Sequence, residues 1–547
     1  MAKKIKVKQS LLMGALTSSF GIFISKILGL FYYSPLNELA GASNMSFYNL
    51  AYSYYEILLQ ISSAGVPFAI AALVAKYEAK EDYKTVLVVK KMGISIVMAL
   101  SLVASISFLL LANPLAKQSL GSAAPISDIE ELKTLFYILT IAVVLVPFLS
   151  ALRGYCQGLK RLDIYASGQV LEQFIRVFSI IFLSYLCIKI FKLESIWAIY
   201  MALAAASIGA GFSIIYTKLL AKKDEKHIEE LASNQTEEGK AGKEIVKEII
   251  SLGIPYLIVS ILSNATMIIN TTFFIDYMTK VNGPEIYEYA KLSSGILQAN
   301  CAKLSGIPAV ISTGFCSSMV PYLSEMMEKQ DYEGIKKQVN QILDAALFVL
   351  VPMMVIFFFF AKDIYYIMYG SQSLELGESL LKSACLQYFL GVVDMLFSSM
   401  MVTLNLKHKA IRVLIVSFLI KLVVFFPCVK LFGTYGMSYS NAIYDFINIS
   451  LNLYFLNKAY GVNILVTLKR AVLMFGTSLV MALPVYFAYS FVNFNYTNRL
   501  LDIVYMGVCG IAMLDIYLLL TFKLKLPQLI FDIKKPDIKS LIARFKS

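Results

Sequence analysis

Charged residues are scarce in this chain of 547 residues: Asp, Glu, Lys and Arg make up 16% of it, where about 25% is usual for soluble proteins. Apolar residues make up 58%, against a soluble norm of about 45–50%. Such a chain has too little polar surface to cover its core in water, which excludes a soluble enzyme, a disordered scaffold and a secreted disulfide module. It is nevertheless basic, with 49 Lys and Arg against 36 Asp and Glu and a formal net charge of +13.

Metal-binding residues are also few, because the chain has only two His and no C-x-x-C pair. Its seven cysteines are scattered singly through apolar runs: Cys156, Cys187, Cys301, Cys316, Cys385, Cys428 and Cys509. We interpret them as small buried hydrophobes. Zinc and haem chemistry are therefore excluded.

Long apolar runs are abundant, and each of fourteen is long enough to cross a bilayer as a helix. Their approximate limits are 10–33, 47–75, 88–112, 134–155, 165–188, 195–217, 248–275, 292–322, 341–361, 383–406, 410–429, 435–457, 464–490 and 500–522. The first run is too long for a signal peptide and lacks a small-residue cleavage site, so we interpret it as a retained helix. The predicted fold class is an all-α polytopic membrane protein with 14 transmembrane helices.

The basic residues predict the orientation of these helices. On the side of the N-terminus lie 35 of the 49 Lys and Arg residues, and only 10 lie on the opposite side. Because cytoplasmic loops carry the excess of Lys and Arg, both termini are predicted to be cytoplasmic. Most of the net charge therefore sets topology and says little about a substrate.

A weak internal repeat divides the first twelve helices into two sets of six. Gly65-Val66-Pro67 ends the second span and Gly306-Ile307-Pro308 ends the eighth, and an Asp-Tyr pair follows each, at 82–83 and 331–332. Copies with an even number of spans point the same way through the membrane. The predicted parts are an N-lobe at 1–217, a cytoplasmic linker at 218–247, a C-lobe at 248–460, two further helices at 461–523 and a basic cytoplasmic tail at 524–547.

Large extramembrane domains are missing. The longest such segment, 218–247, has the mixed charge of a solvated linker, and no G-x-x-x-x-G-K-[ST] motif occurs. ATP-driven transport by this chain alone is therefore not expected. The short loops also argue against a membrane glycosyltransferase, so the chain is predicted not to be an enzyme.

Two lysines lie inside predicted spans without an acid in the same helix to neutralise them. Lys26 is in the first span, with Tyr33 two turns later, and Lys303 is in the eighth, one turn after Asn300. A charge at the bilayer centre costs about 2.5–3.5 kcal/mol on insertion scales, so it normally faces a cavity or a partner. Two interpretations stay open: the lysines snorkel or pair with an acid on another helix, or they hold an anionic substrate in a cavity.

Other charged residues within spans also allow two interpretations. Arg176 follows Glu172 by four residues, the favourable order for an ion pair, and is otherwise a substrate contact. Glu56, with Tyr52 on the same face, either pairs with Lys26 or carries a proton. The role of Lys421 in the eleventh span is open. Tyrosines around the first outside turn are expected to form mostly an interfacial belt; they are Tyr32, Tyr33, Tyr48, Tyr52, Tyr54 and Tyr55.

The twelfth span carries a continuous polar stripe. Its residues recur at alternating spacings of three and four: Ser438, Asn441, Asp445, Asn448 and Asn452. In lipid, such a stripe must face protein or water. It is interpreted either as interhelical hydrogen bonding or as a cation site built around Asp445, with Asp394 of the tenth span as a second candidate.

Three segments together resemble a known family: ISKILGL at 24–30, GVPFAIAALVAKYE at 65–78 and QVLEQFIR at 169–176. The chain resembles the polysaccharide-transporter branch of the multidrug/oligosaccharidyl-lipid/polysaccharide (MOP) exporter superfamily, and within it the YtgP/SpoVB group of MurJ-type lipid II flippases. The similarity extends over essentially the whole chain, and it rests on the order and spacing of the motifs.

This resemblance implies two six-helix lobes around a cavity that opens alternately to each side. It also implies a groove for a polyprenyl tail, shaped by the helices at 461–523. Lys26 and Lys303 match basic positions that hold the substrate's pyrophosphate in the family. Tyr32 and Tyr33 stand where many MurJ proteins carry an Arg-Asp pair, and the basic residue expected near Leu58 is missing.

The function expected from the resemblance is a flippase of the bacterial plasma membrane. It would move an undecaprenyl-pyrophosphate-linked saccharide, with lipid II as the first candidate, from the inner to the outer leaflet. The membrane potential or a coupled Na⁺ or H⁺ would drive it, with no other cofactor. Membrane lipids and cell-wall synthesis proteins are the expected partners, a monomer is expected, and nucleic acid is not. The alternatives are a cation-coupled multidrug exporter and a flippase for another polyprenyl-linked polysaccharide.

Overall fold

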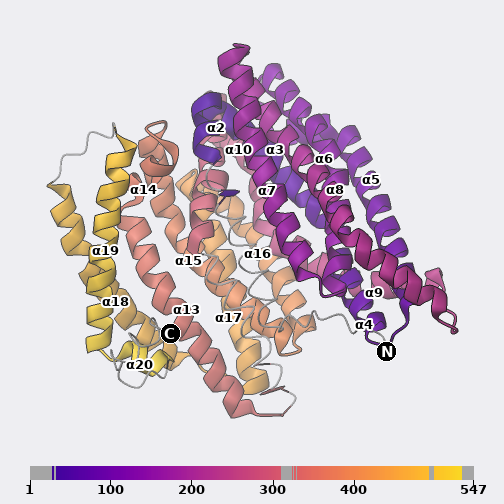
Figure 1. Cartoon of the computed structure of the whole chain (residues 1–547). Coiled ribbons are helices and arrows are strands. Elements are labelled where there is room, and N and C mark those ends of the chain that lie inside the picture. Colours follow the sequence, from indigo (N-terminus) through magenta and orange to yellow (C-terminus); the bar gives the residue numbers. More distant parts are fainter. Residues whose placement is uncertain are drawn as a thin grey trace. The chain divides into compact units, whose positions relative to one another are not determined.

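The computed structural model describes residues 28–29, 32–63, 65–308, 323, 326–327, 329–491 and 498–531, and all regular elements in these ranges are helices (Figure 1). The chain divides into two compact units, Met1–Gln298 and Ala299–Ser547. The helices of the first unit are α2 (Tyr33–Ala40), α3 (Ala42–Ser63), α4 (Val66–Glu78), α5 (Tyr83–Leu120), α6 (Ile126–Gly158), α7 (Leu162–Tyr185), η1 (Leu186–Ile190), α8 (Ile196–Asn234), α9 (Gly242–Ser263), α10 (Ala265–Asn282), η2 (Pro284–Ile286) and α11 (Tyr287–Gly295).

A π-helical turn, η3 (Ile296–Cys301), crosses the division between the units. The helices of the second unit are α13 (Tyr332–Phe359), α14 (Ala361–Tyr369), α15 (Leu374–Thr403), α16 (Lys407–Phe432), α17 (Tyr435–Tyr460), α18 (Leu465–Ser490), α19 (Arg499–Lys523) and α20 (Leu526–Phe531).

Neighbouring helices in each unit pack side by side along much of their length (Figure 1). In the first unit α5 packs on α6 and α7 packs on α8, while α9 and α10 lie against α5. In the second unit α15 and α16 flank α17, and α18 packs between α13 and α19. These contacts bring the polar residues of α7 next to α6 and α8, and those of α17 next to α15 and α16.

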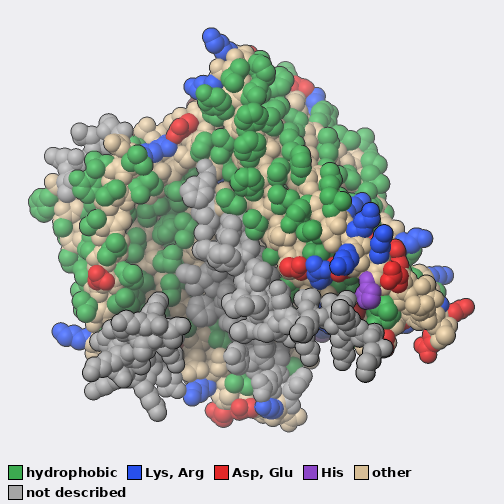
Figure 2. All heavy atoms as spheres, in the orientation of Figure 1, with side chains coloured by type: hydrophobic (Ala, Val, Ile, Leu, Met, Phe, Trp, Pro, Cys, Tyr) green, Lys and Arg blue, Asp and Glu red, His purple; other side chains and the backbone are tan. Residues whose placement is uncertain are grey.

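Ten described helices are long and apolar enough to cross a membrane. They correspond to the second to sixth, ninth to eleventh, thirteenth and fourteenth predicted spans. Most of the first span and the second part of the eighth, 309–322, lie outside the described residues. Figure 2 shows apolar side chains covering the helices of the first unit, and Leu110, Phe178 and Phe212 are among those that are more than half exposed. Such surfaces are stable in lipid and not in water, so the chain is a multi-pass membrane protein.

The structure differs from the prediction at the seventh span and the linker. The seventh span is two helices, α9 and α10, because the chain tightens at Asn264, whose N–H bonds the carbonyl three residues earlier, on Ile261, at 3.2 Å. The linker at 218–247 is mostly helical: α8 runs on to Asn234, and α9 begins at Gly242. Only a short connection between these helices lacks regular structure.

Four helix–helix turns form two matched pairs. Before α5 and before α13, a non-glycine residue with positive φ (Glu81 or Gln330) is followed by an aspartate whose carboxylate caps the helix. In both turns the aspartate N–H bonds the carbonyl five residues earlier, at 3.0 Å for Asp82 and 2.9 Å for Asp331. This bond is typical of a Schellman ending.

The second pair of turns comes before α7 and before α16. Lys160 and Asn405 have positive φ, and the next N–H, of Arg161 or Leu406, bonds the carbonyl five residues earlier at 2.9 and 2.8 Å. The turns before α5 and α7 are thus matched by those before α13 and α16. These are the positions that a repeat of six helices requires.

The cysteines confirm the simplest interpretation where they are described. Of the six in the described ranges, none forms a disulfide, and only Cys509 is not buried. Within those ranges, no three His, Cys, Asp or Glu side chains gather in a way that would hold a metal ion.

The Asp82 cap yields a stability prediction. Its carboxylate accepts hydrogen bonds from the Thr85 N–H at 3.1 Å and from Gln235 Nε2 at 3.0 Å. Partial burial raises the pKa of the Asp82 carboxyl, but these hydrogen bonds outweigh that effect and leave the pKa below its usual value. We expect Asp82→Ala to lose about 1 kcal/mol of stability, a typical cost of losing an N-cap, and to lower the Tm of the purified protein.

Asp82→Asn is the matched control, because an asparagine oxygen also caps helices. It should keep most of the stability at neutral pH. Equal losses in the two variants, measured by thermal unfolding in detergent, would contradict the capping role.

Candidate functional site

Arg176, near the middle of α7, is a cation with an aromatic partner. Its Nη2 donates to the Tyr52 hydroxyl of α3 at 2.9 Å, and its guanidinium lies 5.2 Å from the centre of the Tyr52 ring. Within the described ranges, no carboxylate lies within ion-pair distance of it, and its Nε has no hydrogen-bond partner. Its contacts with the described residues are thus to neutral groups.

Of the two interpretations left open for Arg176, the ion pair with Glu172 is wrong. Glu172 accepts from Arg153 Nη1 of α6 at 2.7 Å, and Arg153 Nη2 donates to Ser213 of α8 at 3.0 Å. At this point α8 also comes close to α7, since a Cβ on Gly209 would lie 2.9 Å from the Glu172 carbonyl oxygen. The carboxylate therefore has its partner on a neighbouring helix.

The tyrosines near Arg176 do not form an interfacial belt, which corrects that prediction. Five of the six are less than 9% exposed: Tyr32, Tyr33, Tyr48, Tyr54 and Tyr55. Their hydroxyls find partners inside the first unit, as when Tyr33 donates to Asn49 Oδ1 at 2.9 Å and the Tyr32 and Tyr48 hydroxyls bond at 2.9 Å. Tyr52 stacks on Tyr48, with ring centres 5.7 Å apart. Together with Arg176 they form what we call the Arg176–tyrosine cluster.

The first predicted span approaches this cluster at its described end. A Cβ at Gly29 would lie 3.1 Å from Gln173 Nε2, one turn before Arg176 on α7. Lys26 itself lies outside the described residues. Glu56 is half-buried on α3, one turn after Tyr52, on which it acts electrostatically.

Lys303 and Asn300 belong to the second unit. Lys303 is half-buried in the helical stretch 302–308, directly after the π-helical turn η3. Asn300 is 5% exposed and is held by α14: its Nδ2 donates to the Tyr365 hydroxyl at 2.8 Å, and its carbonyl accepts from the Tyr369 hydroxyl at 2.8 Å. Turns of this π-helical kind are frequent at functional sites.

The polar stripe of α17 faces protein. Ser438, Asn441, Asn448 and Asn452 are buried. Lys421 of α16 donates from Nζ to Asn441 Oδ1 at 2.5 Å and to Ser440 Oγ at 2.7 Å.

The two candidate carboxylates approach each other between α17 and α15. Asp445 Oδ2 lies 3.4 Å from the position of a Cβ on Gly391, one turn before Asp394. Ser398 Oγ donates to Asp394 Oδ1 at 3.4 Å and accepts from Asn452 Nδ2 at 3.4 Å. The structure therefore brings Asp394, Asp445 and Asn441 together, and it adds Lys421, for which the sequence suggested no role.

Lys291 is a further buried cation, which the sequence assigned to an outside loop. It is 3% exposed, and its Nζ lies 2.7 Å from Asp128 Oδ2 and 3.0 Å from Glu288 Oε1. In the sequence, this pairing was indicated only by the Asp-x-Glu-Glu run at 128–131 and by the i,i+3 spacing of Glu288 and Lys291. This lysine is neutralised, in contrast to Arg176.

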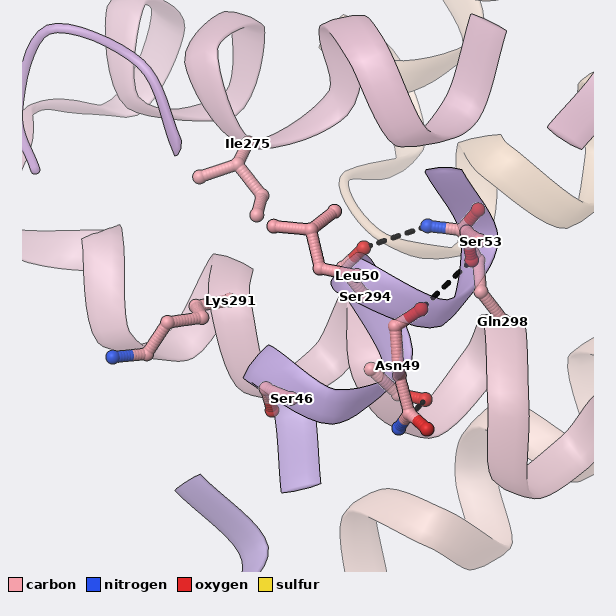
Figure 3. A pocket seen from close by; sticks show the side chains of 9 residues that line it. Ser46, Asn49, Leu50, Ser53, Ile275, Lys291, Ser294 and Gln298 are labelled. Carbon is pink, nitrogen blue, oxygen red and sulfur yellow. Dashed lines mark hydrogen bonds between the residues drawn. The ribbon is translucent and has the colours of Figure 1, made fainter. Parts of the chain in front are cut away.

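A small polar pocket lies beside Lys291 (Figure 3). Its cavity of about 10 Å³ has room for about one water. Ser53 Oγ donates to the Asn49 carbonyl at 2.8 Å and Gln298 Nε2 to Ser294 Oγ at 2.8 Å, so the polar walls are largely satisfied among themselves. It is too small for a saccharide.

A much larger apolar groove of about 580 Å³ lies between α13, α15 and α18 in the second unit. Its lining includes Val351, Phe358, Leu386, Phe389, Val472 and Phe475. Beyond one end, Arg470 of α18 forms an ion pair with the buried Asp344 of α13. Beyond the other, the Tyr489 hydroxyl donates to Asp363 Oδ1 at 2.7 Å. These polar contacts hold α18 beside the groove.

The chain is similar to known proteins. Residues 11–327 match the family described as Polysaccharide biosynthesis protein, and residues 299–426 match the MatE family. The chain is 26% identical to Lipid II flippase MurJ of Bacillus subtilis (strain 168) over 489 residues, which is 88% of each chain. It is 25% identical to Stage V sporulation protein B of the same organism over 376 residues, 66% of this chain and 68% of that protein.

Two solved structures share the fold. A structure of Lipid II flippase MurJ in an inward closed conformation aligns with a TM-score of 0.65 at 17% identity, covering 93% of this chain and 99% of that one. An inward-facing multidrug resistance MATE family transporter of the MOP superfamily aligns with a TM-score of 0.60 at 12% identity, covering 84% and 96%.

The different environments of the two arginines predict different effects on stability. Glu172→Gln leaves Arg153, which is 9% exposed, without its carboxylate. Breaking a buried pair in this way costs about 3–5 kcal/mol. Arg176→Gln leaves no carboxylate unpaired and should cost clearly less. Thermal unfolding of the purified variants should therefore rank Glu172→Gln well below Arg176→Gln, and the opposite order would refute the pairing.

Proposed function

This chain belongs to the polysaccharide biosynthesis protein family, and from that premise we propose that it is a flippase for an undecaprenyl-pyrophosphate-linked saccharide. Lipid II is the first candidate, since a protein named Lipid II flippase MurJ is similar over 88% of the chain. The substrate would pass from the inner to the outer leaflet of the bacterial plasma membrane, with both termini of the protein in the cytoplasm.

The observation that carries the proposal is the environment of Arg176. Arg153 holds Glu172, the carboxylate nearest in sequence, and leaves the Arg176 guanidinium with the Tyr52 hydroxyl. A guanidinium matches the oxygens of a phosphate in a bidentate geometry. A cation within an apolar helix is costly when it has no acidic partner, and none is found among the described residues; such a cation usually marks a functional site. A pyrophosphate would supply the missing negative charge.

Lys26 and Lys303 would complete the site. Both match basic positions of the resembling family, and Lys303 follows a π-helical turn in the eighth span. Tyr33, Tyr52, Glu56 and Asn300 would support the cations by hydrogen bonding. We propose that these residues neutralise the pyrophosphate while the saccharide crosses.

The apolar groove of the second unit would hold part of the undecaprenyl tail. Its lining is almost wholly apolar, and several lining residues are open to the surroundings, among them Leu386 at 58% and Val472 at 71% exposure. Burial of apolar groups contributes about 0.8 kcal/mol per CH₂. The tail could thus stay in the bilayer while the charged head group moves.

Alternating access of two six-helix lobes, with two further C-terminal helices, is the proposed mechanism. The matched turns before α5 and α13, and before α7 and α16, support such a repeat. The membrane potential or a cation at Asp394, Asp445, Asn441 and Asn448 would drive it. We propose a monomer that works beside cell-wall synthesis proteins and catalyses no covalent step.

A second candidate is a cation-coupled multidrug exporter, favoured by the MatE match at 299–426. Protection of cells from cationic dyes on overexpression would support it. A flippase for another polyprenyl-linked polysaccharide is distinguished by which lipid accumulates on the inner leaflet after depletion of the protein.

Charge reversal tests the cation site. Arg176→Glu and Lys303→Glu should abolish complementation of a flippase-deficient strain at normal expression, as should Lys26→Glu, because each places a negative charge where pyrophosphate is expected. In vesicles, Arg176→Gln should lower the flipping rate roughly 10–100-fold, which corresponds to losing one or two charge-assisted hydrogen bonds.

Lys458→Glu is the matched control, since Lys458 is exposed in the last turn of α17. It changes the net charge equally and should complement fully. Full complementation by Arg176→Glu and Lys303→Glu would rule out their role in holding the anion.

Filling the apolar groove tests whether it holds the undecaprenyl tail. Ala471 lines it, so Ala471→Trp should slow the flipping of a long-chain substrate more than that of an analogue with a short prenyl chain. Val480→Trp, at an exposed position of the same helix that is not among the lining residues, is the control. The same slowing for both chain lengths would contradict a groove that holds the tail.

A further inference from the structure

We propose that Lys421 is a built-in counter-cation for the Asp394–Asp445 pair, and that it makes H⁺ rather than Na⁺ the ion that this site exchanges. This inference rests on the proposed function, because it names the ion that would be coupled to flipping. It is carried by how Lys421 is held and by what surrounds the two carboxyls.

Lys421 is held at a fixed point by neutral oxygens. It is 1% exposed in the interior of α16, and its Nζ donates to Asn441 Oδ1 and Ser440 Oγ at 2.5 and 2.7 Å. The ring of Phe425 covers it, with the Nζ 5.1 Å from the ring centre. In the part of the chain that the structure describes, no carboxylate lies within ion-pair distance of the Nζ. The positive charge of Lys421 is therefore buried in the second unit, and no carboxylate of the described residues neutralises it by direct contact.

The carboxyl that acts on Lys421 electrostatically is that of Asp445, one helical turn along α17 from Asn441. Asp445 follows Asn441 by four residues on the same face of α17, and its Oδ2 approaches Gly391 of α15. Both Lys421 and Asp394 act on the Asp445 carboxyl electrostatically. The other titratable groups near them are Tyr444 of α17 and Cys428 of α16, which are neutral at ordinary pH.

The formal charges of these groups determine how many cations the site takes up. With Lys421 protonated and both aspartates ionised, the set carries a net charge of −1. Binding of one H⁺ to a carboxylate oxygen makes the set neutral, and release of that H⁺ restores the charge. Without the lysine, two monovalent cations would be needed. The charge count thus gives one monovalent cation per cycle.

Two of the oxygens that could bind a sodium ion are occupied by the lysine. Asn441 Oδ1 and Ser440 Oγ already accept from the ammonium. The helices α15 and α17 contain no proline and run without interruption, so their backbone carbonyls are used within the helices. A sodium ion would also be repelled by the fixed ammonium.

A protonated carboxyl, in contrast, has a free acceptor nearby. The Asn448 side chain is fully buried, one turn after Asp445. Its amide group interacts with the Tyr444 hydroxyl, and its oxygen has no hydrogen-bond partner within the described ranges. A protonated aspartate becomes a donor, and an amide oxygen is an acceptor. The Asn448 oxygen therefore suits a carboxyl that gains and loses a proton.

The first test is sodium binding, which needs no lipid substrate. The purified chain is unfolded thermally in NaCl and in choline chloride at equal ionic strength, because an ion that binds only the folded state raises Tm. Wild type should show no sodium-specific stabilisation. Lys421→Met, which frees two oxygens beside two carboxylates, should gain one, and Lys430→Met, at an exposed position of the same helix, should behave as wild type.

Two results of that test overturn the proposal. One is sodium-specific stabilisation of the wild type that Asp445→Asn abolishes. The other is a folded Lys421→Met variant that responds to sodium no more than wild type does. The wild-type measurement decides the ion even where the lysine variant does not fold.

The second test measures transport in vesicles at clamped voltage. For one H⁺ exchanged per cycle, each unit of pH difference should change the equilibrium ratio of the lipid-linked saccharide between leaflets about tenfold. Asp445→Asn should abolish this response, and a sodium gradient should have no effect. A response to sodium but not to pH would overturn the assignment. If wild type moves no lipid-linked saccharide, the proposed function fails, and the sodium test still decides the role of Lys421.

Discussion

The cost of holding a charge away from water is the constraint on which this molecule depends. Most charged side chains that lie deep in its helices are paired, as Arg153 is with Glu172. Pairing of this kind recovers part of the desolvation penalty and leaves little net stabilisation. The informative residues are the cations that the fold surrounds with neutral groups, Arg176 and Lys421. At Arg176 the proposed partner is an anionic substrate. At Lys421 the proposed role is to offset one charge of the Asp394–Asp445 pair, which then binds a proton.

The scaffold controls which cation is neutralised. At Gly209 the absence of a Cβ lets α8 approach the backbone of α7. Ser213, one turn along α8, then binds Arg153, which in turn holds Glu172. Arg153 thus takes up the carboxylate that would otherwise lie beside Arg176. The same logic applies on α15, where Gly391 makes room for the Asp445 carboxyl.

Features that depend on local rules could be predicted from the sequence. Runs of about 20 apolar residues identify spans because the bilayer has a fixed thickness, and ten of them coincide with described helices. The burial of the α17 stripe followed from the cost of polar groups in lipid. The Asp-Tyr pairs at 82–83 and 331–332 indicated a repeat, and both aspartates cap helices after turns of the same geometry.

Features that depend on which helices become neighbours could not be predicted. Glu172 lies at the favourable spacing from Arg176, yet its partner comes from α6. The tyrosines near the first turn have the composition of an interfacial belt, but tertiary packing buries five of the six. Lys421 and Lys291 acquire their partners only when α16 meets α17 and when α11 meets α6.

The most direct test of the account is the binding of a lipid diphosphate to the purified protein. Native mass spectrometry can compare undecaprenyl diphosphate with the uncharged alcohol of the same chain length, for wild type and for Arg176→Gln. The account predicts that wild type prefers the diphosphate by at least about tenfold, or ~1.4 kcal/mol, and that the variant loses most of this preference while still binding the alcohol. Equal binding of both lipids by wild type, or an unchanged preference in the variant, would contradict it.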